Sequence, residues 1–244
     1  MVLSGARHLL VLSRSGAASD AAQAAIAELE ASGAQVHARK CDVTAQSDVA
    51  QALEDARKSL PPIRGVFHTA MVIEDALMAN LEHEAFSKVL APKVRGAQIL
   101  DRLTAKDPLD HFVLFSSATT LVGNPGQANY VAANGYLEGL ARNRRARGLP
   151  ALAVSWGARS DAGYLARNTE VSDLLARKLG RHALSAHEAL DGLFDLMGRP
   201  QDDVGSASTG YARIDWQAAK RDLKLLSTPL AELLSLGSAD AGGT

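Results

Sequence analysis

The sequence predicts an α/β fold built on a parallel sheet, and two observations lead to this fold class. Short apolar runs of strand length alternate with longer segments whose apolar residues recur at helical spacing. The chain has 244 residues, of which 47% are hydrophobic, so it can bury the core of a single globular domain. Strands that alternate with helices favour parallel pairing. We therefore expect a Rossmann-type doubly wound sheet with helices on both faces.

The elements follow in order along the chain. In the first half, strands are expected in HLLVLSR, QVHARKCD and IRGVFHTA, with helices near residues 21–32 and 47–59 between them. In the second half, a long helix across VLAPKVRGAQILDRL precedes the strand HFVLFSS, a helix ending near Gly148, the strand ALAVSWG, shorter helices and a strand in YARID. Residues 1–228 are expected to form one domain, and residues 229–244, which end in SADAGGT, a C-terminal tail or linker.

Composition excludes several classes of protein. A formal net charge of -1 gives no support for nucleic-acid binding. The single cysteine, Cys41, excludes an internal disulfide and a CxxC metal site, and we expect it to be a buried thiol. The seven histidines show no metal-ligand spacing, so no metal is expected. Without a long apolar segment or a signal peptide, we expect a soluble cytoplasmic protein with no membrane partner.

Four residues form a constellation that suits the reduction of a ketone: Lys93, Ser117, Tyr130 and Asn134. Ser117 ends a strand pattern, whereas Tyr130 and Asn134 share one face of the following helix. A phenol has a pKa of about 10, so a nearby ammonium is needed to stabilise the phenolate. Tyr130 could then act as general acid, and a serine hydroxyl could stabilise the developing oxyanion. Each residue alone has an ordinary structural explanation, but the combination favours the catalytic interpretation.

The stretches FHTAMVIEDAL, VLAPKVRGA, FVLFSSATTLVGNPGQANYVAANGYLE and ALAVSWG resemble the ketoreductase domain of modular type I polyketide synthases. That domain belongs to the short-chain dehydrogenase/reductase superfamily. In most of the superfamily a Lys follows the catalytic Tyr by four positions and an Asn lies on the preceding helix. Polyketide ketoreductases exchange the two, and this chain has the exchanged arrangement, with Lys93 on the earlier helix and Asn134 after Tyr130.

The resemblance implies that NADPH reduces a β-ketoacyl thioester carried on the phosphopantetheine arm of an acyl carrier protein, with neighbouring polyketide synthase domains. Tyr130 would donate the proton, Lys93 would activate it, Ser117 would bind the oxyanion, and Asn134 would organise Tyr130, Lys93 or a relay water. Two alternatives remain open. The chain could be a noncatalytic remnant or scaffolding fragment of a synthase, or a free-standing reductase of small ketones.

The first strand and Gly-rich turn of the Rossmann fold have no counterpart in this sequence. The segment SGARHLLVLSRSG resembles the family from the end of its first helix onward. By that resemblance, the strand without a counterpart would lie between the strands at residues 8–14 and 63–70. We therefore expect two exposed strand edges and a gap in the core.

Several cofactor contacts are still implied by the resemblance. Arg14, in the stretch Ser13-Arg14-Ser15-Gly16, replaces the acidic residue of NAD-preferring enzymes and can accommodate the 2′-phosphate of NADP. The complete implied set is Ser13, Arg14, Asp42, Val43, Thr69, Ala70, Lys93 and Tyr130, and Trp156 and Gly157 should approach the nicotinamide side.

Two further features of the sequence concern the stereochemistry of the product and the docking of a carrier protein. The triplet Ile73-Glu74-Asp75 resembles the LDD motif of B-type ketoreductases, and Val122 stands where A-type enzymes carry Trp; both imply a D-configured hydroxyl. Alternatively, the acidic pair could merely favour a helix dipole.

A cluster of arginines could dock an acidic carrier protein; it comprises Arg142, Arg144, Arg145 and Arg147. Cations near a helix end are also favourable without any partner, and we prefer that interpretation.

Overall fold

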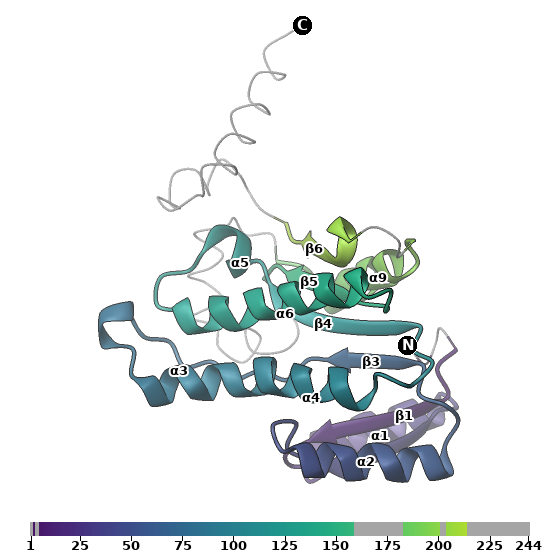
Figure 1. Cartoon of the computed structure of the whole chain (residues 1–244). Coiled ribbons are helices and arrows are strands. Elements are labelled where there is room, and N and C mark those ends of the chain that lie inside the picture. Colours follow the sequence, from purple (N-terminus) through teal and green to yellow (C-terminus); the bar gives the residue numbers. More distant parts are fainter. Residues whose placement is uncertain (1, 3–4, 159–182, 201–203, 214–244) are drawn as a thin grey trace, which may run out of the picture.

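The computed structural model describes residues 2, 5–158, 183–200 and 204–213, and these residues form an α/β structure (Figure 1). The strands are β1 (His8–Ser13), β2 (Gln35–Lys40), β3 (Gly65–His68), β4 (His111–Ser117), β5 (Leu152–Trp156) and β6 (Ser208–Tyr211). The α-helices are α1 (Asp20–Ala31), α2 (Gln46–Ser59), α3 (His83–Leu90), α4 (Gly96–Leu103), α5 (Thr119–Val122), α6 (Ala128–Ala146) and α9 (Ala186–Met197). The short helical segments among the described residues are η2 (Met78–Asn80), η3 (Ala91–Arg95) and η4 (Gly205–Ala207).

Helix ends follow local sequence signals. The Ser19 side chain accepts a hydrogen bond from the backbone N–H of Ala22 and begins α1. Ser185 and Glu188 form a reciprocal capping box at the start of α9. The long helix expected across VLAPKVRGAQILDRL is continuous, but its middle, η3, is a π-helical segment that contains Pro92. Because proline has no N–H, it cannot make the ordinary helical hydrogen bond, and the helix widens there.

One strand prediction was misplaced. The final strand was expected in YARID, but β6 runs through Ser208–Tyr211, so Tyr211 is its last residue and not its first. The sequence STGY contains a Gly and only one β-branched residue, and it is recruited as an edge strand by its parallel pairing with β5. The expected tail at residues 229–244 lies outside the described residues.

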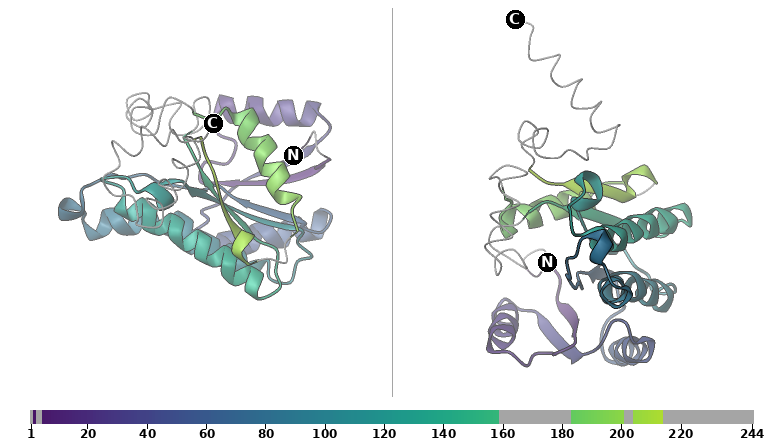
Figure 2. Two further views of the ribbon diagram at one scale, coloured as in Figure 1. Left: turned by 90° about the horizontal axis from the view of Figure 1, so that it is seen from above. Right: turned by 90° about the vertical axis from the view of Figure 1, so that its left-hand side faces the viewer.

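All strand pairs are parallel, and helices cover both faces. In Figure 2, α1 and α9 lie on one face, and α2, α4 and α6 lie on the other. The main core lies between the strands and α2, α4 and α6, and it includes Val49, Ile99, Leu114 and Leu137. Cys41, directly after β2, is 2% exposed, which agrees with the expected buried thiol.

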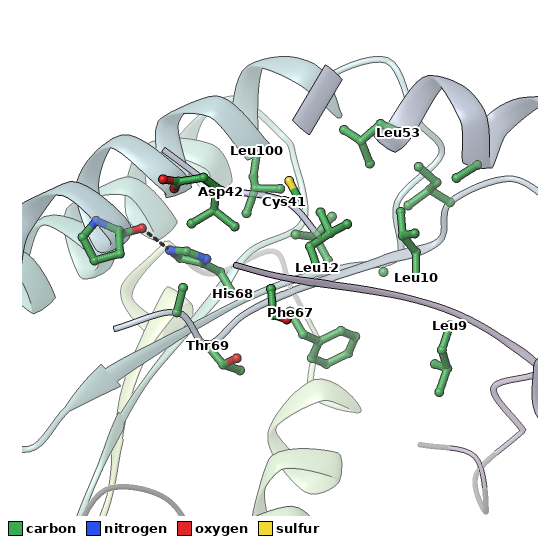
Figure 3. A pocket seen from close by; sticks show the side chains of 18 of the residues that line it. Leu9, Leu10, Leu12, Cys41, Asp42, Leu53, Phe67, His68, Thr69 and Leu100 are labelled. Carbon is green, nitrogen blue, oxygen red and sulfur yellow. Dashed lines mark hydrogen bonds between the residues drawn. The ribbon is translucent and has the colours of Figure 1, made fainter. Parts of the chain in front are cut away.

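The sheet is divided at the position where the sequence predicts a gap. Strands β1 and β2 form one sheet, and β3, β4, β5 and β6 form the other, in that order. Between β1 and β3 lies a cavity of about 860 Å³ that is lined by residues of both strands (Figure 3). The expected gap in the core is therefore present, and it separates the β1–β2 unit from the rest of the sheet.

No helix in the described ranges is long and apolar enough to cross a bilayer. Within the same ranges, no group of three or more His, Cys, Asp or Glu side chains is arranged to hold a metal ion.

Candidate active site

The four catalytic candidates converge at the carboxyl end of β4. Ser117 is the last residue of that strand, and Tyr130 is in the first turn of α6 with Asn134 one turn later. Lys93 lies in η3, the widened part of the helix that contains Pro92. The sequence spacing therefore predicted the elements that carry these four residues correctly.

Lys93 is 2% exposed and lies beside Tyr130. Its Nζ donates a hydrogen bond of 2.7 Å to the carbonyl oxygen of Phe115 and lies 5.5 Å from the centre of the Tyr130 ring. Burial lowers the pKa of Lys93 from its ordinary value of 10.5 to about 7. A cation held this close to the phenol favours the phenolate, and the lowered pKa means that its charge depends on pH near neutrality.

The Asn134 side chain is buried and contacts the backbone of α6. Its Nδ2 donates a hydrogen bond of 2.7 Å to the carbonyl oxygen of Tyr130. Its Oδ1 is buried and has no hydrogen-bond partner among the described residues. Because buried acceptors are nearly always paired, this oxygen is suited to accept a proton donor such as a relay water.

The Ser117 hydroxyl is oriented by its neighbour Thr119. The Ser117 Oγ accepts hydrogen bonds from the backbone N–H of Thr119 at 3.3 Å and from the Thr119 hydroxyl at 3.0 Å. A hydroxyl has one proton to donate, and these contacts use only its acceptor capacity. Ser117 can therefore direct its proton to a substrate carbonyl oxygen.

His68, which was not predicted from the sequence to be a site residue, contacts the segment that carries Lys93. Its Nε2 lies 3.0 Å from the carbonyl oxygen of Pro92, and the residue is 3% exposed. Burial, with a smaller contribution from the positive charge of Lys93, lowers the pKa of His68 to about 4. The ring is therefore neutral at pH 7, and its Nε2–H can donate to Pro92. Its position at the end of the IRGVFHTA strand was the available signal.

Glu138 is a second residue near the site that was not predicted from the sequence. It is 8% exposed, and its Oε1 lies within 2.8 Å of the hydroxyl oxygens of Ser116, Thr120 and Ser155. These hydroxyls come from β4, α5 and β5. The Glu138 carboxylate therefore links α6 to these three elements, which lie around Ser117. Glu138 follows Tyr130 and Asn134 at successive four-residue steps, and this shared helical face was the signal that could have identified it.

We expect Glu138→Leu to lower the free energy of unfolding by about 1–3 kcal/mol, because the buried hydroxyls of Ser116 and Ser155 and the partly buried hydroxyl of Thr120 lose the carboxylate that accepts from them. Glu138→Gln should restore most of that loss, since its amide oxygen can still accept hydrogen bonds. Urea denaturation of the two variants checks the prediction. Equal stability of wild type and Glu138→Leu would contradict it, and Glu54→Leu on the exposed side of α2 is the matched control.

The six other implied cofactor residues are brought together by the structure. They line the part of the 860 Å³ cavity where β1, β2 and β3 end; the six are Ser13, Arg14, Asp42, Val43, Thr69 and Ala70. Hydrogen bonds from the Thr44 backbone N–H and hydroxyl lower the pKa of Asp42. Ligands of open α/β sheets bind in crevices at the carboxyl ends of strands.

A nicotinamide dinucleotide fits this crevice in part. The cavity provides a guanidinium at Arg14 and a carboxylate at Asp42, and the buried Oδ1 of Asn134 offers an acceptor on the catalytic side. The described residues before β1 contain no Gly-rich strand-to-helix turn, so they provide no cradle of N–H groups for a pyrophosphate.

The acidic triplet of the sequence is attached to the start of α6. Gln127 Nε2 donates to both carboxylate oxygens of Asp75, at 3.2 and 3.0 Å, and Asn129 Nδ2 donates to the carbonyl oxygen of Glu74 at 2.8 Å. Neither acidic residue lies within a helix, but the Asp75 carboxylate lies beside Gln127, the residue that precedes α6, so the helix-dipole interpretation stays open. Asp75 also lies beside the turn that carries Tyr130.

Val122, the other stereocontrol candidate, and Trp156, which is expected on the nicotinamide side and in substrate and stereocontrol, are both buried. Val122 is 2% exposed in α5, and Trp156 is 7% exposed at the end of β5. The Trp156 ring packs against Phe115 and Tyr211, with ring centres 5.5 and 5.7 Å apart. Val122 and Trp156 therefore flank the β4–β5 end of the site, and neither lines the cavity between β1 and β3.

The arginine cluster at the end of α6 has partners within the chain. Arg144 is 1% exposed, packs 3.9 Å from the centre of the Phe112 ring, and pairs with Asp101. Arg145 donates to the carbonyl oxygen of Ala151, and Arg147 also pairs with Asp101. Arg142 lies 3.8 Å from the Glu138 carboxylate. These contacts agree with the structural interpretation of the cluster.

Arg144→Met should lower the free energy of unfolding by about 2 kcal/mol. Breaking a buried ion pair costs about 3–5 kcal/mol, but Arg147 remains beside Asp101 and reduces the loss. Urea denaturation measures the change, and Arg142→Met, at an exposed position of the same helix, should change stability by less than about 0.5 kcal/mol. An equal loss in both variants would show that Arg144 has no special role.

Comparisons with known proteins give a consistent result. Residues 1–161 match the family model described as KR domain. Reducing polyketide synthase PKS1 of Cochliobolus heterostrophus is 44% identical over 174 residues, which cover 71% of this chain and 7% of that protein. Trichosetin synthetase PKS-NRPS1 of Gibberella fujikuroi is 38% identical over 230 residues, which cover 92% of this chain and 6% of that protein. The chain thus spans less than a tenth of the length of these relatives.

Solved structures agree with the sequence matches. A structure described as A-type ketoreductases from a modular polyketide synthase has a TM-score of 0.83 and 33% identity, and the match covers 96% of this chain and 49% of that chain. The first ketoreductase of the tylosin polyketide synthase has a TM-score of 0.77 and 34% identity, with coverage of 93% and 49%. A Serratia marcescens short-chain dehydrogenase/reductase, at 20% identity and a TM-score of 0.66, shares the fold.

Proposed function

Because this chain belongs to the KR domain family, we propose that it reduces a β-ketoacyl thioester to the β-hydroxyacyl form with NADPH. The observation that carries the proposal is the burial of Lys93 against the ring of Tyr130, beside the Ser117 hydroxyl at the end of β4. A structural lysine gains little from such burial, because the charged form is disfavoured there. The unfavourable burial of the Lys93 charge is explained if the ammonium must stabilise the phenolate of Tyr130.

Each residue then has a chemical role. NADPH, when bound, supplies the hydride that the β-carbon of the substrate receives. Tyr130 donates its phenolic proton to the carbonyl oxygen as that oxygen gains negative charge. The Ser117 hydroxyl donates a hydrogen bond to the same oxygen, and the Lys93 ammonium stabilises the phenolate that Tyr130 becomes. The buried Oδ1 of Asn134 accepts a hydrogen bond from a water that returns a proton to Tyr130.

The crevice at the strand ends is the proposed cofactor site. Arg14 would pair with the 2′-phosphate of NADPH, Asp42 and Val43 would border the adenine, and Thr69 and Ala70 would line the path toward the nicotinamide. The preference for NADPH over NADH rests on Arg14, because NAD-binding sites place a carboxylate at this point.

The substrate is proposed to be a thioester on the phosphopantetheine arm of an acyl carrier protein, within a larger polyketide synthase. The attachment of Asp75 to Gln127 supports the B-type assignment, because it fixes the acidic triplet beside the turn that carries Tyr130. Val122, which leaves less bulk than Trp, is consistent with this assignment. The expected product carries a D-configured hydroxyl.

An assay of the purified chain tests the proposal. We expect oxidation of NADPH in the presence of an N-acetylcysteamine β-ketoacyl thioester, with chiral chromatography showing a D-hydroxy product. A carrier-bound substrate should lower KM relative to the free thioester. A chain that reduces small ketones equally well without a carrier would support a free-standing reductase instead, and an L-hydroxy product would contradict the B-type assignment.

The division of the sheet favours a second candidate, in which this chain by itself is a noncatalytic fragment of a synthase. The proposed cofactor residues line one end of the cavity between β1 and β3, so the gap itself could weaken NADPH binding. Fluorescence titration of the purified chain with NADPH distinguishes the candidates. No binding and no turnover would favour the fragment, whereas micromolar binding with turnover would exclude it.

A further inference from the structure

Lys93 lies in a part of its helix that departs from α-helical geometry. In η3 the backbone N–H of Gly96 donates to the carbonyl oxygen of Ala91, five residues earlier, which is the hydrogen bond of a π-helix. Pro92, at the start of this segment, has no N–H to donate. Single π-helical turns are rare and occur often at functional sites. The direction in which the Lys93 side chain leaves the helix therefore depends on contacts from outside the helix.

The His68 ring supplies such a contact. His68 is the last residue of β3 and is 3% exposed, and its Nε2 lies 3.0 Å from the carbonyl oxygen of Pro92 (Figure 3). Since a carbonyl oxygen can only accept, Nε2 carries the proton and donates it. Burial and the charge of Lys93 lower the pKa of His68 to about 4, and hydrogen bonds to the backbone of Pro92 and Lys93 act in the opposite direction. At pH 7 the ring is thus a neutral donor that contacts the backbone of both residues.

Gly96 allows the His68 ring to lie directly against the helix. A Cβ at this position would lie 3.2 Å from Cε1 of His68 and 3.2 Å from Cγ2 of Val43, which is closer than ordinary van der Waals contact. Gly96 is buried at the start of α4, and because glycine has no Cβ, the ring can fill this space. The ring therefore lies against the helix on both sides of Lys93, at Pro92 and at Gly96.

The backbone of His68 is fixed to the strand that Lys93 contacts. In the ladder between β3 and β4, His68 is paired with Leu114, the residue before Phe115. The Lys93 Nζ donates to the carbonyl oxygen of Phe115 at 2.7 Å and lies 5.5 Å from the centre of the Tyr130 ring. His68 therefore joins the two elements that make this contact, because its backbone is paired with β4 and its ring is hydrogen-bonded to η3.

We propose that His68 is a positioning residue, which holds the Lys93 ammonium beside the Tyr130 ring by bridging the end of β3 to η3. The inference rests on the proposed role of Lys93 in the reduction, and it assigns no chemical step to His68 itself. A neutral donor suits this position, because a protonated imidazole would repel the ammonium next to it. Without the hydrogen bond from His68, η3 should shift and the Lys93 side chain should turn toward water.

The pKa of Lys93 in His68 variants tests the proposal without any turnover. The chain is labelled with ¹³C at the lysine Cε atoms, and the Lys93 signal is identified by its loss in Lys93→Met. In wild type this signal should titrate at about 7, because Lys93 is buried. His68→Leu removes the donor and should raise the pKa of Lys93 to about 8 or higher, since a displaced ammonium regains contact with water. His68→Gln, whose Nε2 can still donate to Pro92, should restore the wild-type value.

Steady-state kinetics provide the second measurement. His68→Leu should lower kcat for a β-ketoacyl thioester by about tenfold or more and change KM by less than about twofold, because Lys93 stabilises the phenolate only as the proton is transferred. His68→Gln should stay within about threefold of wild type, because it keeps the donor. His111→Leu is the matched control, since His111 is the first residue of β4, at the opposite end of that strand from Ser117. It should change neither kcat nor the pKa of Lys93.

A pKa of Lys93 that keeps its wild-type value in His68→Leu, or that rises equally in His68→Gln, would overturn the proposal, because the hydrogen bond would then not hold Lys93. If His68→Leu does not fold, Gly96→Ala decides the question. Its added Cβ should displace the His68 ring and raise the pKa of Lys93, and an unchanged value would again overturn the proposal. A wild-type chain without turnover would contradict only the proposed reduction, because the NMR titration does not depend on catalysis.

Discussion

Tyr130→Phe is expected to lower kcat for reduction of a β-ketoacyl thioester by about 100- to 10,000-fold, the usual contribution of a positioned general acid. The substitution removes one oxygen and leaves the ring beside Lys93, so the packing of α6 should be unchanged. KM and the dissociation constant of NADPH should change little, because the proton is needed only in the transition state. Steady-state kinetics and fluorescence titration measure these quantities.

Tyr136→Phe is the matched control for this experiment. Tyr136 lies on the same helix and packs against the main core, outside the catalytic constellation. Its loss of a hydroxyl should leave kcat within about twofold of wild type. If Tyr130→Phe retained full activity, the proton would have another source, and the position of Lys93 would need a different explanation.

The catalytic constellation could be predicted from sequence because it depends on spacing within elements. Ser117 is the end of a strand pattern, and Tyr130 and Asn134 are one helical turn apart, so the spacing places Ser117 at the carboxyl end of its strand and the other two on one face of the next helix. The gap between β1 and β3 was predictable for a different reason. The order of parallel strands is fixed by the fold, and a strand without a counterpart leaves its neighbours unpaired.

Other features depend on tertiary contacts that spacing does not reveal. The three hydroxyls around Glu138 come from three different elements, and only the packing of α6 against β4 and β5 brings them to one carboxylate. The attachment of Asp75 to Gln127 joins positions that are 52 residues apart. The misplaced β6 has the same origin, because its pairing with β5 overrides a weak strand propensity.

The lowered pKa of Lys93 could not be predicted from the sequence either, because it results from burial in the folded chain. It leads to the second prediction with a large expected effect. Lys93→Met should lower kcat by about 100-fold or more, because the phenolate of Tyr130 loses its cation. The same substitution should change how stability depends on pH. An unfolded lysine keeps its proton to about pH 10.4, whereas burial lowers the pKa of folded Lys93 to about 7. Between these values the unfolded state binds more protons than the folded state.

The sign of the effect follows from this difference. Where the unfolded state binds more protons, the free energy of unfolding rises with pH, by about 1.4 kcal/mol per pH unit for one proton. From pH 7 to pH 9, the free energy of unfolding of wild type should therefore rise relative to that of Lys93→Met. The variant should be most stable relative to wild type near pH 7 or below. The raised pKa of the Cys41 thiol acts in the opposite direction, but it is common to both chains and cancels in the comparison.

Urea denaturation of both chains across this pH range measures the difference directly. Loss of the hydrogen bond from Lys93 to the Phe115 carbonyl should change the free energy of unfolding of the variant by the same amount at every pH. It should leave the slope of that free energy against pH unaffected. Lys106→Met, at an exposed position, should follow the wild-type curve. Parallel curves for wild type and Lys93→Met would mean that Lys93 remains charged when folded. Converging curves together with lost turnover would mean that the chain gives up stability near neutral pH to keep a cation beside Tyr130.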